Sequence, residues 1–96
     1  MSLEAALEKV TNSETLLAFV RLLAKDKEDE ATKESMSPSS PYGAGANGWQ
    51  NRNIETFLNA ASDWAESTNF GLTQGIAPSN PWKQFAVFLY CGKIYE

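Results

Sequence analysis

Apolar residues recur at helical spacing in three stretches of the chain, and the clearest of these lies in its second half. One side of that stretch is apolar and comprises Ile54, Phe57, Leu58, Ala61, Trp64 and Ala65. The other side is polar and comprises Glu55, Asn59, Asp63 and Glu66. A stripe with this period is typical of an amphipathic helix with one face in a core. Asn69 and Gly71 follow it and are residues that commonly end helices.

The first half of the chain predicts a short helical turn and then a longer helix. Ser2 is placed to cap the turn, and Thr11 with Glu14 three residues later has the pattern of a capping box for the longer helix. Apolar residues then follow at helical spacing, namely Leu16, Phe19, Val20 and Leu23. The segment from Lys25 to Glu30 has no apolar face. We expect it to be a solvated charged extension of the helix or a frayed end.

A last helix is predicted to begin at Asn80-Pro81, because asparagine caps helices and proline is tolerated at their first position. Its inward stripe is Trp82, Phe85, Ala86 and Leu89. Further apolar residues at Val87, Phe88 and Tyr90 indicate a central helix that is covered from more than one side. Gly92 is expected to end it in the left-handed conformation. Residues 93–96 would then form an extended tail, with Ile94 and Tyr95 turned inward.

Between the two halves, residues 35–50 are mostly serine, glycine and proline, which predicts a flexible loop without core contacts. No stretch of the chain alternates between apolar and polar residues as a strand does. We therefore expect an all-α fold in one domain over residues 1–96. It would be a small bundle of three main helices plus a short N-terminal helix, with a long Ser/Gly/Pro-rich loop. The expected core residues are Phe19, Phe57, Trp64, Trp82, Phe85 and Leu89.

Three segments together resemble a small bacterial domain family of unknown function. They are Val10-Thr11-x-x-Glu14 with Phe19, Trp49-x-Asn51 leading into Ile54-x-x-Phe57-Leu58-x-Ala60-x-x-x-Trp64, and Pro81-Trp82-x-x-Phe85-Ala86 with Gly92-Lys93-Ile94-Tyr95-Glu96. The resemblance implies a shared fold and a bacterial cytoplasmic setting, where domains of this size often accompany toxin–immunity or contact-dependent systems. It transfers no catalytic residue, because the family has no assigned activity. Residues 35–48 depart from the more charged linker of the family.

The charge balance restricts the classes of partner. Eight lysines and arginines stand against twelve acidic residues, a net charge of −4, which disfavours nucleic acid and anionic membranes. The longest apolar run, Phe85 to Cys91, is far too short to cross a membrane. The single cysteine, Cys91, cannot form an intramolecular disulfide, so a reducing cytoplasm fits best. The opening Met1-Ser2-Leu3 resembles residues added for expression and receives no functional weight.

The residue types present do not assemble a catalytic or metal site. The chain has no histidine, which removes the usual general base and the commonest transition-metal ligand. No lysine lies in an apolar sequence context that would activate it as a nucleophile. The glycine-rich segment 43–48 lacks the Lys-Ser/Thr ending of a phosphate loop. We therefore expect no enzymatic activity, no cofactor and no metal, and we expect Cys91 to be a buried, unreactive thiol rather than a redox group.

Three residues are candidates for partner binding: Trp49, Asp63 and Glu66. Trp49 either packs the entry of the following helix against the core or stands ready as an anchor for a partner. Asp63 and Glu66 share the polar face of their helix, where simple solvent exposure is the alternative. These residues favour a non-enzymatic protein-interaction module, such as an immunity-like inhibitor of a basic partner. The alternative is a small-ligand or nucleotide-sensing domain with a pocket between the helices and the loop.

Overall fold

A computed structural model describes residues 2–95 and contains α-helices joined by turns. The elements in order are α1 (Leu3–Glu8), α2 (Ser13–Met36), α3 (Ile54–Thr68), the short 3₁₀ helix η1 (Leu72–Gln74) and α4 (Pro81–Ile94). None of the described residues forms a strand. The prediction of an all-α bundle with three main helices and a short N-terminal helix is therefore confirmed.

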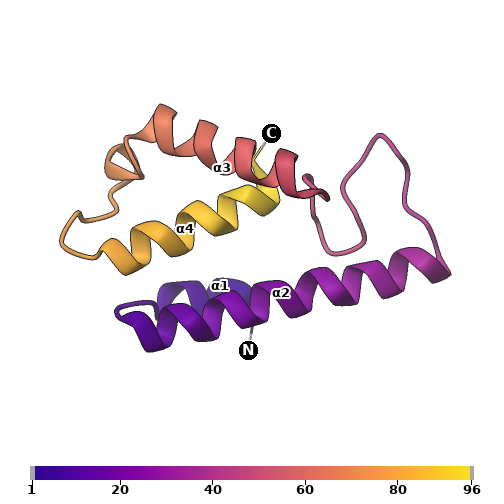
Figure 1. The fold of residues 1–96 in the computed structure, drawn as a ribbon, viewed down its shortest axis with the longest axis horizontal. Helices are drawn as coiled ribbons and strands as arrows, with labels where there is room; N and C mark the ends of the chain where they lie inside the picture. Colours follow the sequence, from indigo (N-terminus) through magenta and orange to yellow (C-terminus); the bar gives the residue numbers. More distant parts are fainter. Residues whose placement is uncertain (1, 96) are drawn as a thin grey trace.

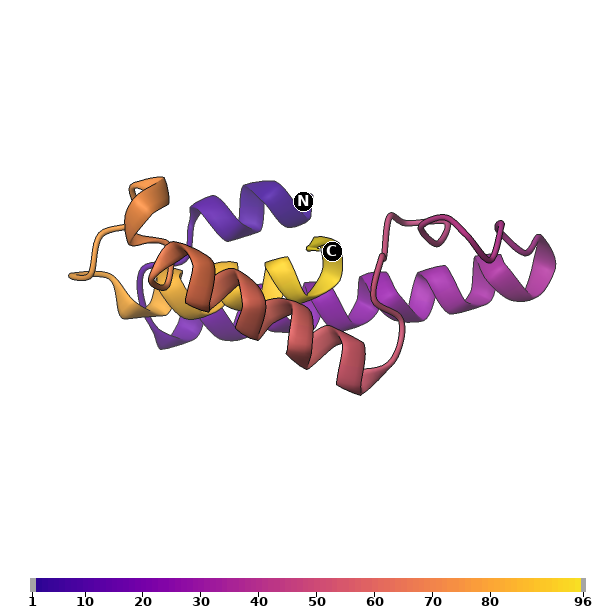
Figure 2. The same cartoon turned by 90° about the horizontal axis from the view of Figure 1, so that it is seen from above.

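Helix α4 is the centre of the bundle, as its apolar composition predicted. It contacts α3 on one side and both α1 and α2 on the other, an arrangement visible in Figure 1 and, from above, in Figure 2. Helix α3 packs against α4 and η1 and against no other element within residues 2–95. One side of α3 is therefore left uncovered by other helices.

Ser2 and Leu3 take part in the fold, as the predicted N-terminal turn of helix requires. The Ser2 hydroxyl accepts a hydrogen bond from the Ala5 amide at 3.1 Å and so caps α1, as its sequence position predicted. Leu3 is buried in the core cluster beside Phe19 and Ala86. Met1 and Glu96 lie outside the described residues.

The start of α2 lies one residue later than the predicted capping box. Asn12, not Thr11, is the cap: its side chain accepts from the Thr15 amide at 2.9 Å, and the Thr15 hydroxyl accepts from the Asn12 amide at 3.1 Å. Glu14 takes no part in this box. A threonine hydroxyl supplies the same reciprocal contact that a glutamate usually supplies, so the motif-based prediction selected the wrong pair.

The ends of α3 and α4 were partly predicted. Asn69 closes α3 in the left-handed conformation (φ 51°), and Asn80 caps α4 by accepting from the Lys83 amide at 3.1 Å. Gly92, by contrast, does not end α4, which continues to Ile94. A β-carbon at Gly92 would lie 2.7 Å from the Phe57 ring, so this glycine lets the ring of α3 approach the α4 backbone. Ile94, predicted inward, is 42% exposed.

The inward face of α4 was partly misassigned. Ala86 is fully buried, but Trp82 and Phe85 are 41% and 47% exposed and lie outside the core. Of the other expected core residues, Phe19 and Trp64 are buried, whereas Phe57 and Leu89 are half-buried. On α3, Ile54 and Leu58 are likewise exposed. The apolar residues of α3 and α4 exceed what one small bundle can cover, so their periodicity overstates the width of the buried face.

Among the described residues, no helix combines the length and apolar character that crossing a membrane requires.

Candidate functional site

The connection between α2 and α3 is tied to α2 by two carboxylates, which corrects the prediction of a loose linker at residues 35–50. Residues 35 and 36 belong to α2, and the non-helical connection is 37–53. Glu30 Oε1 accepts hydrogen bonds from the backbone amides of Asn47 at 3.0 Å and Trp49 at 3.3 Å. Glu34 holds the amides of Ser39 at 2.6 Å and Ala46 at 2.9 Å.

Glu30 is the more deeply buried of the two anchoring carboxylates. The residue is fully buried, and a β-carbon at Gly45 would overlap its carboxyl group. The segment from Lys25 to Glu30 is therefore not a uniformly solvated face, because Glu30 points under the connection and Asp26 is only partly exposed. Buried carboxylates are rare unless hydrogen-bonded, and here the connection supplies the donors. We expect this contact to order residues 45–49.

Trp49 and Lys93 meet at one carboxylate oxygen. Asp26 Oδ2 accepts from the Trp49 indole nitrogen at 2.8 Å and from the Lys93 ammonium at 2.8 Å. Lys93 is 6% exposed and Trp49 is 5% exposed, with its ring stacked on Phe57 at 6.0 Å. Trp49 thus takes the packing role of its two alternatives, and its burial argues against a role as an exposed anchor. The sequence did not indicate that Lys93 would be buried.

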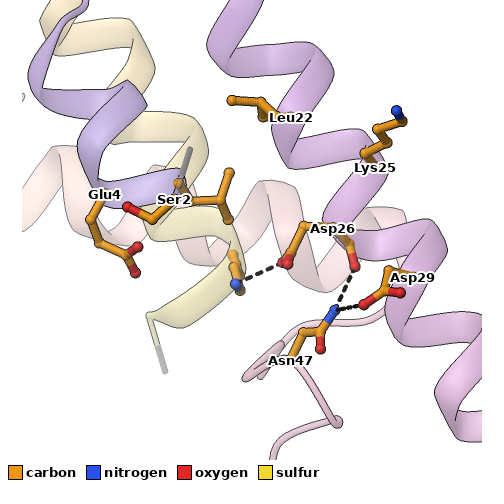
Figure 3. A pocket seen from close by; sticks show the side chains of 9 residues that line it. Ser2, Glu4, Leu22, Lys25, Asp26, Asp29 and Asn47 are labelled. Carbon is orange, nitrogen blue, oxygen red and sulfur yellow. Dashed lines mark hydrogen bonds and ion pairs between the residues drawn. The ribbon is translucent and has the colours of Figure 1, made fainter.

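Beside this network lies an open pocket of about 650 Å³, shown in Figure 3. Helix α1, helix α2, Asn47 of the connection and Lys93 of α4 form its walls. The lining residues are Ser2, Leu3, Glu4, Leu22, Lys25, Asp26, Asp29, Asn47 and Lys93. The sequence analysis did not find this site, because its residues come from distant segments whose charges carry no spacing motif.

Hydrogen bonds lower the pKa values of two of the pocket carboxylates, Glu4 and Asp29. A hydrogen bond from its own backbone amide, helped by the Tyr90 hydroxyl, lowers the pKa of Glu4. Hydrogen bonds from Asn47 and then Lys33 lower the pKa of Asp29. Asp26 and Asp29 each have a lysine within 2.9 Å, so most of the local charge is paired. The pocket is polar and mixed in charge, and residues 2–95 contain no cluster of three ligands that could hold a metal ion.

Asp63 and Glu66 lie on α3, away from this pocket and from Trp49. Both side chains are exposed, and residues 53–82 contain Glu55, Asp63 and Glu66 but no lysine or arginine. Glu66 lines a second hollow, of about 490 Å³, together with Ser62, Ala65, Asn69, Phe70 and Phe88. The two predicted acidic residues are therefore both exposed on α3, whereas Trp49 belongs to another part of the molecule.

An aromatic ladder stands next to Glu66, since Phe70 and Phe88 line the same hollow. The ring centroids of Phe70 and Phe88 are 5.7 Å apart, and those of Phe85 and Phe88 are 6.0 Å apart. Phe70 and Phe85 are each about half exposed. Sequence reasoning missed this ladder because it placed Phe85 inward. We call Asp63, Glu66, Phe70, Phe85 and Phe88 the acidic aromatic surface.

Phe70 also has an unusual backbone conformation. Its φ is 53°, directly after Asn69 at 51°, and its amide donates to the Ala65 carbonyl at 2.8 Å. Positive φ is uncommon for a bulky residue and costs about 1 kcal/mol or more. A glycine would satisfy the turn without this cost. Phe70 therefore destabilises the backbone of this turn relative to a glycine at the same position.

Comparison with known proteins identifies the family of the chain. Residues 12–96 match the model of a family of unknown function. The chain belongs to this family, DUF7660. Searches of curated proteins and of solved structures found no match. The resemblance to a domain family of unknown function is thereby confirmed, and the family brings no activity or ligand to this DUF7660 domain.

Cys91 of the DUF7660 domain is expected to be inert in the folded state. It is 8% exposed, and burial raises the pKa of its thiol to about 11. Two pKa units correspond to about a hundredfold less thiolate at neutral pH. Labelling with a thiol-specific disulfide reagent should therefore be slow for the native protein and fast in urea. Equal labelling rates in the two conditions would contradict the buried-thiol assignment.

Proposed function

We propose that this DUF7660 domain is a non-enzymatic protein-interaction module that docks a basic protein segment on its acidic aromatic surface. The observation that supports this most is the ladder of Phe70, Phe88 and Phe85, in which Phe70 and Phe85 are about half exposed, beside the Glu66 carboxylate. Exposed apolar patches rimmed by polar residues mark interaction sites. The proposal includes a bacterial cytoplasmic setting and, as one concrete form, an immunity-like inhibitor.

The chemistry of the surface suggests what its partner carries. Phenylalanine rings provide large apolar contacts and attract cations to their faces. Glu66 borders the hollow that Phe70 and Phe88 line, and the whole of residues 53–82 lacks a positive charge. A lysine or arginine next to an apolar side chain would therefore find both a carboxylate and an aromatic face. The strained backbone of Phe70 supports a role beyond folding for its ring.

Ligand sensing is the second candidate function, and the pocket beside Asp26 is the feature that favours it. Its volume of about 650 Å³ lies within the range of small-molecule sites, and polar groups from α1, α2, α4 and the connection converge on it. Glu4, Asp26 and Asp29 oppose a phosphate group, so a nucleotide fits poorly. A small cation or zwitterion suits these walls better.

The proposed docking predicts a specific salt and charge dependence. A partner captured from the native cytoplasm should associate more slowly as salt rises, because attraction between opposite charges is screened over about 8 Å at physiological ionic strength. Reversing the charges of Asp63 and Glu66 to lysine should lower the association rate at least about tenfold at low salt. Surface plasmon resonance over a salt series measures both effects.

The matched control is Trp64→Phe, a conservative change in the core that should leave association nearly unchanged. Phe70→Gly tests the aromatic part: it should weaken binding while stability is retained, because glycine relieves the positive φ. A salt-independent association rate, or full binding by the charge-reversed variant, would overturn the electrostatic docking. Recovery of a bound small molecule with no protein would replace it with ligand sensing.

A further inference from the structure

We infer that a second copy of this chain docks on the acidic aromatic surface, through a two-fold interface formed by the uncovered side of α3. The inference rests on the proposed function only in taking that surface as a docking surface. The inference identifies the occupant of that surface as a second copy of the chain. Self-association would then cover the surface until a basic partner displaces the second copy.

The first observation is another hollow, at the opposite end of α3, with opposite charge. It measures about 360 Å³ and is lined by Lys27, Trp49, Asn51, Arg52, Asn53, Ile54, Phe57 and Leu58. Ile54 is 76% exposed and Leu58 is 50% exposed. Lys27 and Arg52 are its charged residues, and no carboxylate lines it. The start of α3 thus presents exposed apolar side chains together with positive charge.

The second observation is that both hollows open on the same side of α3. Ile54, Leu58, Ser62 and Glu66 are spaced by four residues, which places them along one ridge of a helix. The first two line the basic hollow and the last two line the acidic one. No other element among residues 2–95 covers this ridge, since α3 packs only on α4 and η1.

Charge complementarity between the two ends indicates a second copy in antiparallel orientation. In a two-fold interface the same patch serves both copies, so the start of one α3 meets the end of the other, twice. Arg52 would then face Glu66 of the other copy. The exposed Ile54 would face the hollow beside Phe70 and Phe88. The basic start of each α3 would contact the acidic end of the other α3. Both pairs of surfaces are then used, so the assembly is a closed dimer.

The ridge also suits a close crossing of the two helices. Positions 52 and 66 lie equally far from position 59, so the axis would pass between Leu58 and Ser62. Glu66 lies seven helical residues from position 59, so at 1.5 Å per residue each charge pair would lie roughly 10 Å from the axis. Ser62 is small, and its hydroxyl already donates to the Leu58 carbonyl at 2.8 Å. Burial at the crossing would therefore leave no hydroxyl without a partner.

Sedimentation of the full chain over a wide concentration range tests the inference. The wild type should form a dimer, whereas Arg52→Glu and Glu66→Arg should each be monomeric, because each variant places two pairs of like charges across the interface. Arg21→Glu is the matched control. It makes the same charge change at an exposed position of α2, away from the ridge, and should remain dimeric.

Mixing the two monomeric variants gives the decisive result. One Arg52→Glu chain and one Glu66→Arg chain restore opposite charges at both pairs, so the mixture should form a one-to-one dimer. Circular dichroism confirms that each variant is folded. A monomeric wild type, or a mixture that stays monomeric, would overturn the inference. If the wild type is monomeric but Asp63→Lys still abolishes partner capture, the inference of a dimer fails and the proposed function stands. The two failures are therefore distinguishable.

Discussion

Trp64→Ala is expected to lower the free energy of unfolding by about 3–5 kcal/mol, a large part of the roughly 5–15 kcal/mol that a small domain has. Trp64 is 2% exposed and packs with Ala65 and Cys91 between α3 and α4. Its indole nitrogen also donates to the Gln74 side chain at 3.0 Å, which ties η1 to the bundle. The substitution removes this bond and leaves a cavity that the helix backbones cannot close. Urea denaturation followed by circular dichroism measures the loss.

Phe85→Ala provides the matched comparison, because it truncates another aromatic residue that sequence periodicity placed in the same core. Phe85 is 47% exposed and contributes mainly its stacking on Phe88, so a loss of only about 1 kcal/mol is expected. Equal destabilisation by the two substitutions would mean that the exposed and buried faces of α4 are inverted.

Glu30→Ala is expected to destabilise the domain by about 2–4 kcal/mol, since each buried donor left without an acceptor costs about 1–3 kcal/mol. The carboxyl group accepts hydrogen bonds from two backbone amides, those of Asn47 and Trp49. Its loss should also free residues 45–49 and shift the fluorescence of Trp49 towards that of an exposed indole. Urea denaturation and emission spectra of the same variant test both consequences.

Glu30→Gln separates the hydrogen bonds from the charge. Glutamine keeps an acceptor for the two amides, and its NH₂ group replaces Oε2, which has no hydrogen-bond partner within residues 2–95. The nearest cation, the Lys27 ammonium, is 4.0 Å away and partly exposed. We therefore expect glutamine to lose less stability than alanine, because it keeps the acceptor for the two amides while its buried NH₂ group stays without one. A loss as large as that of alanine would show that the ion pair, rather than the amide contacts, holds the connection.

Local signals in the sequence were sufficient for the helices and for much of their capping. Asn80-Pro81, Asn69 and Ser2 act within one helical turn, where a side chain meets backbone groups three or four residues away. Such contacts need no distant partner, so they can be predicted from adjacent residues. The capping box at Asn12 was not predicted, because Thr11 with Glu14 and Asn12 with Thr15 both have the spacing of a capping box. Only the geometry of the structure distinguishes the two pairs.

The candidate surfaces were harder to predict from the sequence than the helices. The exposure of Asp63 and Glu66 follows from their place on the polar side of an amphipathic helix. Phe85 could not be placed outside in this way, because α4 is apolar on several sides and its periodicity does not select one face. The rotation of α4 is set by what covers it, and the small residues Ala86 and Gly92 face its neighbours most closely.

The sequence by itself determined the helical class, the approximate helix positions, the net negative charge and the absence of histidine chemistry. Only the tertiary structure decided that Glu30 and Lys93 are buried, and that Trp49 meets Glu30 through its backbone amide and Lys93 through Asp26. The physical reason is that a charged residue can be buried only where partners from elsewhere in the chain satisfy it. Those partners lie 17 to 67 positions away along the chain, beyond the reach of any local pattern.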